Sequence, residues 1–271
     1  MKLFIIDFTE FYLTIHFIGA GPGDPELITL KAHRIISKSP ICLYAGSLIP
    51  KKILQYCPKN VKLVDTSKMD LESILTEFKL ANEKQLDVAR LHSGDLSIWS
   101  ALGEQTRRLK RENISYTITP GVPSFCAASA ILENEFTLPE ITQTVILTRT
   151  EGKASSMPLN ENLQNMAKTQ ATLIIHLSIQ NLKNIITTLI PFYGKSCPAA
   201  IVYRATWPDQ KVIRGNLGNI VLKTPLEIQR TALIIISKAL NNKNFTESSL
   251  YSSNYETRFK KIKNYKDFTN E

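Results

Sequence analysis

The feature that most constrains the fold is a regular alternation of strand-like and helix-like segments along most of the chain. Short apolar runs such as 41–44 and 86–91 alternate with amphipathic segments such as 71–81 and 101–111. This order is typical of α/β proteins, in which parallel strands are joined by crossover helices. The sequence therefore predicts α/β architecture with mainly parallel or mixed sheets.

The motif Pro-Gly-Val-Pro at 120–123 interrupts this pattern, which starts again beyond it. Prolines on both sides of a glycine are strong punctuation of a chain. We therefore predict a first α/β domain over 16–123 and a second over 124–240. Residues 1–15 are predicted to be an N-terminal extension, and the Lys- and Asn-rich residues 241–271 a polar C-terminal tail.

The chain is basic, with 33 Lys and Arg against 24 Asp and Glu and a net charge of +9. Such an excess suits a solvated surface, a polycarboxylate ligand or a nucleic acid, and charge alone does not separate these. No stretch reaches the ~18 uncharged apolar residues that a membrane helix needs. The four cysteines are scattered without a CxxC spacing. We therefore expect a cytoplasmic protein with no membrane segment, no metal site and no disulfide framework.

The motif GAGPGD at 19–24 lies between a predicted strand and a predicted helix over 25–38. A dinucleotide-binding fingerprint would fall here, but Asp24 stands where GxGxxG needs its last glycine. Asp24, Pro25 and Glu26 suit a helix N-terminus, so they occupy the positive end of the helix dipole where a phosphate would bind. A phosphate site is therefore not expected, and a tight turn that only packs strand against helix remains the alternative.

A second turn of the same kind, HSGD at 92–95, directly follows another predicted strand. Two Gly-Asp turns at the ends of parallel strands indicate a ligand crevice beyond the carboxyl edge of a sheet. A ligand with a positive charge and an amino-acid part suits such acidic turns better than a nucleotide phosphate does.

These motifs, in this order, resemble those of the tetrapyrrole (corrin/porphyrin) methylases. The segments that carry the resemblance are GAGPGDPELITLKA, ARLHSGDLSIWSALGEQ and TPGVPSF, followed more narrowly by YAGSLIP, DTSKMDLESI, TRTEGKASSMP, ATLIIHLS, YRATWPDQ and TALIII. Together they extend over nearly all of 16–238. The one clear departure is Leu96, where many relatives have proline, which loosens the turn without removing its backbone groups.

The resemblance implies a two-domain α/β enzyme, a homodimer, with its active-site trough between the domains. It implies S-adenosyl-L-methionine as methyl donor and S-adenosyl-L-homocysteine as product. The narrower segments imply that the acceptor is C11 of precorrin-4, or of cobalt-precorrin-4, a polycarboxylate tetrapyrrole of cobalamin biosynthesis.

Carried over by position, the resemblance also implies contacts to the cofactor from both domains. These are Pro22, Ser93, Gly94, Asp95, Ile98, Ser124, Phe125, Leu177, Ala200 and Ala232. For Pro22, a role on the substrate side is the alternative. Four basic residues in or beside the matched motifs are expected to bind the acidic substrate, since arginine recognises carboxylates in bidentate fashion. These are Arg149, Lys153, Arg204 and Arg214. For any one of them a surface ion pair is the alternative.

Methyl transfer from a sulfonium needs alignment and a dry cleft more than a strong acid or base. If a proton leaves the acceptor carbon afterwards, His92, Tyr44 and Tyr203 are candidate bases, because each lies at a predicted strand end or loop. A turn histidine bonded to backbone is the alternative for His92.

Two rival functions stay open at this stage. One is a methylase of the same fold that acts on another precorrin carbon or another substrate. The other is a basic, non-catalytic nucleic-acid-binding protein. Nucleic acid is not the expected partner, because Lys and Arg do not cluster with aromatic residues in a known nucleic-acid-binding motif.

Overall fold

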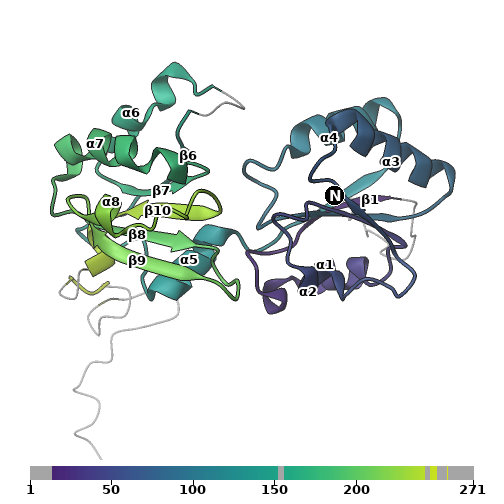
Figure 1. Cartoon of the computed structure of the whole chain (residues 1–271), viewed down its shortest axis with the longest axis horizontal. Helices are drawn as coiled ribbons and strands as arrows, with labels where there is room; N and C mark the ends of the chain where they lie inside the picture. Colours follow the sequence, from purple (N-terminus) through teal and green to yellow (C-terminus); the bar gives the residue numbers. More distant parts are fainter. Residues whose placement is uncertain (1–13, 152–155, 242–244, 249–254, 256–271) are drawn as a thin grey trace, which may run out of the picture. The chain divides into compact units, whose positions relative to one another are not determined.

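The computed structural model, which describes residues 14–151, 156–241, 245–248 and 255, divides into two compact units (Figure 1). The first unit is the chain up to Glu133 together with Val202–Val212 and Ile228–Leu233, and the second is the remainder. The first unit contains one five-stranded sheet, and most of a second five-stranded sheet belongs to the second unit. Helices accompany both sheets, so the predicted α/β class is confirmed. The domain boundary after residue 123 stays a prediction. The predicted extension and tail fall almost entirely outside the described residues.

The first sheet has the strand order β3-β2-β4-β1-β5, and all of its strands run parallel. Its strands are β1 (Ile15–Gly19), β2 (Ile41–Tyr44), β3 (Lys62–Asp65), β4 (Val88–His92) and β5 (Tyr116–Thr119). Because β1 pairs with both β4 and β5, the loops that follow these three strands leave the same edge of the sheet as neighbours. A ligand site at this edge therefore draws on three separate parts of the sequence.

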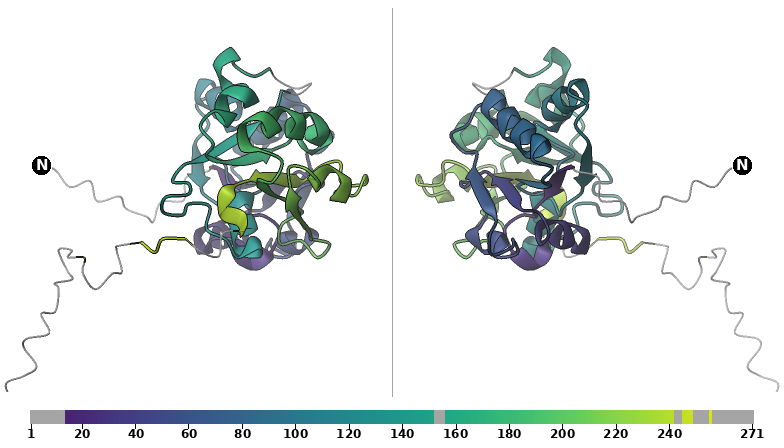
Figure 2. Two further views of the ribbon diagram at one scale, coloured as in Figure 1. Left: turned by 90° about the vertical axis from the view of Figure 1, so that its left-hand side faces the viewer. Right: turned by 90° about the vertical axis from the view of Figure 1, so that its right-hand side faces the viewer.

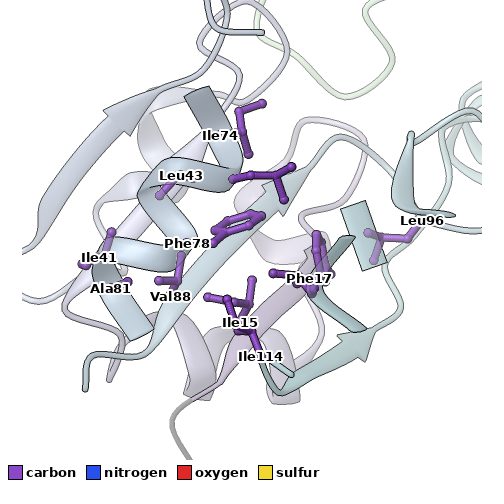
Figure 3. Packing of buried hydrophobic residues seen from close by; sticks show 12 residues of the cluster. Ile15, Phe17, Ile41, Leu43, Ile74, Phe78, Ala81, Val88, Leu96 and Ile114 are labelled. Atoms are coloured by element: carbon purple, nitrogen blue, oxygen red, sulfur yellow. The ribbon is translucent and has the colours of Figure 1, made fainter. Parts of the chain in front are cut away.

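Two helices cover one face of this sheet, α3 (Leu71–Glu83) and α4 (Leu102–Arg111) (Figure 1). Phe78 of α3 packs in one core cluster with Phe17 of β1 and Leu43 of β2, as Figure 3 shows. Burying each such side chain stabilises the fold by roughly 1.5–3 kcal/mol, so this core fixes the strands that carry the loops. The short helices α1 (Leu30–Ile36) and α2 (Lys51–Leu54) pack on the opposite face. In the right-hand view of Figure 2 this unit faces the viewer.

The prediction of one continuous helix over 25–38 is wrong. A 3₁₀ turn, η1 (Pro25–Leu27), ends at Ile28, whose backbone is extended with φ −78° and ψ 145°. The Thr29 hydroxyl then accepts a hydrogen bond from the Ala32 amide at 3.2 Å and caps α1. Asp24 caps the 3₁₀ turn, not α1. The exclusion of a phosphate site therefore rests on the missing glycine alone.

The second sheet is mixed, with the order β6-β7-β10-β8-β9, in which β6 runs parallel and β10 antiparallel to β7. Its strands are β6 (Val145–Arg149), β7 (Thr172–His176), β8 (Pro198–Tyr203), β9 (Lys211–Asn216) and β10 (Ala232–Ile236). The helical segments outside the first sheet's connections are α5 (Ser124–Leu132), η2 (Leu159–Glu161), α6 (Leu163–Ala167), η3 (Ile179–Asn181), α7 (Leu182–Tyr193), α8 (Ile220–Lys223) and η4 (Lys238–Asn241). The left-hand view of Figure 2 looks on the second unit.

Among the described residues, no helix combines the length and the apolar character needed to cross a bilayer. The same part of the chain holds no group of three or more His, Cys, Asp or Glu side chains placed to bind a metal ion. All four cysteines are free, and Cys126 is exposed while Cys42 and Cys197 are buried.

Candidate active site

Three glycine turns meet at the carboxyl edge of the first sheet, after β1, β4 and β5. Gly21 and Gly94 pair across the first two turns, the Gly21 amide donating to the Gly94 carbonyl at 3.2 Å and the Gly94 amide to the Gly21 carbonyl at 2.7 Å. A Cβ on Gly121, in the third turn, would lie 2.2 Å from the Gly94 oxygen and 2.6 Å from the Gly19 carbonyl carbon. Only glycine allows backbones to approach so closely.

Asp95 ties the second turn to the third. One carboxylate oxygen accepts the Ser97 amide at 2.8 Å, and the other accepts the Gly121 amide at 2.9 Å. Burial raises the pKa of this carboxyl group, but the hydrogen bonds from Ser97, Gly121 and Leu96 outweigh burial and hold the pKa below its ordinary value. The carboxylate is therefore ionised at neutral pH. Its two oxygens hold the second and third turns together through the Ser97 and Gly121 amides.

The cofactor residues predicted in the first unit are mostly grouped around these turns. Pro22 is buried in the first turn, and Ser93, Gly94, Asp95 and Ile98 form or flank the second. Ser124 and Phe125 lie in the first turn of α5. The Ser124 amide nitrogen is 3.7 Å from the position of a Cβ on Gly94, so α5 begins directly beside the second turn.

The other predicted cofactor residues come from strands or strand ends of the second sheet. Ala232 starts β10 and counts with the first unit. Ala200 is buried within β8, and Leu177 directly follows β7, both in the second unit. Leu177 is 76% exposed, which is unusual for a leucine at a strand end and suits a contact with a ligand.

Left-handed backbone at non-glycine residues marks the same segments. The residues with φ between +46° and +68° in or beside the predicted site are Trp99, Ala101, Leu177, Arg204, Thr206 and Thr231. Such conformations cost of order 1–3 kcal/mol each and cluster at functional sites. Most of the remaining cases follow helix ends, as Gln85 and Asn113 do. The sequence gives no sign of this strain.

The segment after β8 clamps the first glycine turn, a contact that sequence reasoning missed. The Trp207 indole N–H donates to the Pro22 carbonyl at 2.9 Å, and the Asp24 amide donates to the Thr206 hydroxyl at 2.9 Å. Gly23 faces the indole so closely that a Cβ there would lie 2.3 Å from Trp207 Cδ1. The first turn is thus shaped by residues far along the chain.

We expect Thr206→Val to destabilise the protein by about 1 kcal/mol, because the Asp24 amide loses its acceptor. Thr206→Ser keeps the hydroxyl and should stay within about 0.5 kcal/mol of the parent. Urea unfolding of both variants measures the difference. An equal loss in the two variants would show that the hydroxyl does not hold the turn.

The basic residues predicted to bind substrate differ in their surroundings. The Arg204 guanidinium lies 3.9 Å from the centre of the Trp207 ring and pairs with Asp209 at 2.8 Å, so part of its charge is already balanced. Arg149 donates to the Thr150 and Ser156 carbonyls at 3.2 Å and 3.0 Å. Arg214 is exposed on β9. Lys153 lies outside the described residues.

Arg149 also lines a pocket of about 360 Å³ within the second unit. Its lining residues include the acidic Glu151 and Glu161 together with Asn162 and Pro158. A guanidinium can bind a carboxylate through charge-assisted hydrogen bonds, and Arg149 stays a predicted substrate residue.

Two of the three candidate bases, His92 and Tyr44, are poorly matched to proton removal near neutral pH. The pKa of His92 is lowered to about 3, mainly by burial and to a smaller extent by the charge of Arg90. Its imidazole is therefore neutral and weakly basic. Burial and the Asp65 carboxylate raise the pKa of Tyr44. Tyr203 ends β8 and is half-buried. The group that takes a proton from the acceptor carbon therefore stays open.

Comparison with known proteins shows the family and the fold. The chain is 50% identical over 249 residues to the precorrin-4 C(11)-methyltransferase of Sinorhizobium sp. The aligned region covers 92% of this chain and 98% of that relative. A solved cobalt-precorrin-4 methyltransferase superposes with a TM-score of 0.82 at 34% identity, covering 85% of this chain and 97% of that one. A uroporphyrin-III C-methyltransferase of Thermus thermophilus, complexed with S-adenyl homocysteine, shares the fold (TM-score 0.71, 23% identity, 84% of this chain and 93% of that one). Residues 14–221 match the family described as Tetrapyrrole (Corrin/Porphyrin) Methylases, and the chain belongs to this family.

Proposed function

We propose that this protein transfers a methyl group from S-adenosyl-L-methionine to C11 of precorrin-4 or cobalt-precorrin-4. The observation that carries the proposal is the 50% identity to a precorrin-4 C(11)-methyltransferase over 98% of that relative's length. The alignment therefore extends over nearly the whole of both chains. The rival of a nucleic-acid-binding protein is set aside, because the family is one of methylases.

The carboxyl edge of the first sheet supports the cofactor part of the proposal. S-adenosyl-L-methionine is a sulfonium cation with an amino-acid part, and the edge offers an ionised Asp95 and closely packed backbone groups in place of a phosphate cradle. We propose that Pro22, Ser93, Gly94, Asp95, Ile98, Ser124, Phe125, Leu177, Ala200 and Ala232 contact the cofactor. Rigid turns suit in-line methyl transfer, because the reaction depends on alignment of the methyl group with the attacking carbon.

The basic character of the chain supports the substrate part. A tetrapyrrole with acetate and propionate arms is a polyanion, and a net charge of +9 favours its approach. We propose that Arg149, Lys153, Arg204 and Arg214 bind these arms. We further propose that the protein acts as a homodimer in the cytoplasm.

Incubation of the protein with ¹³C-methyl S-adenosyl-L-methionine and either precorrin-4 or cobalt-precorrin-4 tests the proposal. We expect the label to appear at C11, as identified by NMR of the product, and no label on uroporphyrinogen III as control substrate. A product labelled at another carbon would favour the rival methylase. Absence of label from both acceptors would contradict the proposal.

A further inference from the structure

Arg90 is a buried arginine within the apolar core of the first sheet. It lies on β4 in register with Phe17 of β1 and Leu43 of β2, and the residue is 7% exposed. Side chains alternate along a strand, so Arg90 shares its face with Val88, which belongs to the core of Figure 3. A cationic side chain in this position is exceptional, since arginine is rarely buried without a partner of opposite charge.

The guanidinium is only partly satisfied by hydrogen bonds. Within the described residues it makes one hydrogen bond, from Nη1 to the Thr66 hydroxyl at 2.8 Å, and its buried Nε has no acceptor. The Thr66 hydroxyl in turn donates to the Tyr44 carbonyl at 3.2 Å. Burial lowers the pKa of Arg90 to about 10, so the group stays charged at neutral pH. A buried charge of this kind is costly unless an anion completes it.

A second unused polar atom lies beside it. His92 is two residues further along β4, on the same face, and the charge of Arg90 helps to keep its imidazole neutral. Nε2 of His92 is buried and has no hydrogen-bond partner in the part of the chain that the structure describes. In the tautomer that carries its proton on Nε2, His92 is a donor next to the guanidinium.

The position of this pair connects it with the proposed cofactor edge. Thr66 and Tyr44 lie where β3 and β2 end, so the guanidinium reaches the carboxyl edge of the sheet. His92 is the last residue of β4 and immediately precedes the Ser93-Gly94-Asp95 turn. A ligand bound at that edge would lie close to both donors.

We propose that Arg90 and His92 form a receptor for one carboxylate of a bound ligand, with Thr66 orienting the guanidinium. The inference rests on the proposed function, which supplies two carboxylates of the same chemistry. One is the amino-acid carboxylate of S-adenosyl-L-methionine, and the other is an acid arm of the tetrapyrrole. Arginine binds either through charge-assisted hydrogen bonds, with the neutral imidazole adding a further donor.

A ligand-binding role and a purely structural role of Arg90 predict different results for Arg90→Met, which keeps much of the length of the side chain and removes its charge. If Arg90 awaits an anion, the ligand-free variant should unfold at the same temperature as the parent or higher, because an uncompensated buried charge is gone. If Arg90 instead stabilises the fold by joining β4 to the end of β3, the variant should unfold at a lower temperature.

Binding measurements then identify the source of the carboxylate. Arg90→Met and Arg90→Lys are compared with Arg107→Met, an exposed arginine of α4, by calorimetry with S-adenosylhomocysteine and with methylthioadenosine, which lacks the amino-acid part. A loss of at least tenfold for S-adenosylhomocysteine alone, with methylthioadenosine unaffected, assigns the receptor to the cofactor. Unchanged cofactor binding with a KM for the tetrapyrrole raised at least tenfold assigns it to the substrate.

Other outcomes overturn the receptor. They are unchanged affinity and KM in Arg90→Met, an equal loss in Arg107→Met, or a ligand-free Arg90→Met protein that is less stable or does not fold. The proposed function is judged separately, on methyl transfer by the parent protein. Methylation at C11 together with an inert Arg90→Met change would leave the function standing and remove only the receptor.

Discussion

Gly121→Ala is expected to destabilise the protein by about 3 kcal/mol and to lower cofactor affinity more than tenfold. The added methyl group would lie 2.2 Å from the Gly94 oxygen and 2.6 Å from both the carbonyl carbon and the oxygen of Gly19. All three are backbone atoms of neighbouring turns, so no side-chain rotation relieves the overlap. The turns must separate, and the proposed cofactor contacts separate with them.

Gly103→Ala is the matched control. A Cβ on Gly103 meets no atom within 4 Å, and the residue lies in the first turn of α4. Both changes reduce the freedom of the unfolded chain in the same way, so their difference isolates the overlap. We expect Gly103→Ala to be neutral or to stabilise by about 0.5–1 kcal/mol.

Urea unfolding and calorimetric binding of S-adenosyl-L-methionine measure both glycine variants. Similar unfolding free energies for Gly121→Ala and Gly103→Ala would mean that the three turns do not pack as described. A destabilised Gly121→Ala protein with normal cofactor affinity would instead separate the edge of the sheet from the cofactor site.

The elements of the first sheet could be predicted from sequence because their signals are local. The alternation of apolar runs with amphipathic segments placed the strands predicted at 41–44 and 86–91 to within a few residues of β2 and β4. The helix over 25–38 was the exception, since its apolar spacing continues through a break that Thr29 creates by capping α1. A single hydroxyl competing for a backbone amide leaves the hydrophobic periodicity unchanged.

The shape of the candidate site could be predicted only in part. The glycines of the turns were visible, and parallel strand order brings their loops to one edge. The contact between Trp207 and Pro22 joins residues 185 positions apart, so no local sequence pattern near either residue predicts it. The left-handed backbone of Leu177 and the burial of Arg90 are likewise set by tertiary packing, not by their neighbours in sequence.

Asp95→Ala is the second change with a large expected effect. It removes the acceptors of the Ser97 and Gly121 amides, and hydrogen bonds to a charged group contribute roughly 1.5–3 kcal/mol each. We expect a loss of about 3 kcal/mol in stability, the lower end of the sum for two such bonds, and at least a tenfold loss of affinity for S-adenosyl-L-methionine. Asp95→Asn keeps one acceptor oxygen and should lie between the alanine variant and the parent.

The matched control is Asp70→Ala, since Asp70 also accepts a backbone amide, that of Ser73 at 2.8 Å, and also has a lowered pKa caused by Ser73. Asp70 caps α3 and takes no part in the three turns. Its loss should reduce stability and leave cofactor affinity unchanged. Equal affinity losses in the two alanine variants would trace the effect to general destabilisation.

The pH dependence of the Asp95 effect follows from its lowered pKa. Because the folded-state pKa lies below the ordinary value of 3.8, the stabilisation is fully present above that value and is lost as pH falls through the folded-state pKa. The difference in unfolding free energy between the parent and Asp95→Ala should therefore be constant near neutral pH and shrink in acid. Urea unfolding across this range measures it. A difference that grew on acidification would mean that the protonated carboxyl group, not the carboxylate, holds the turns together.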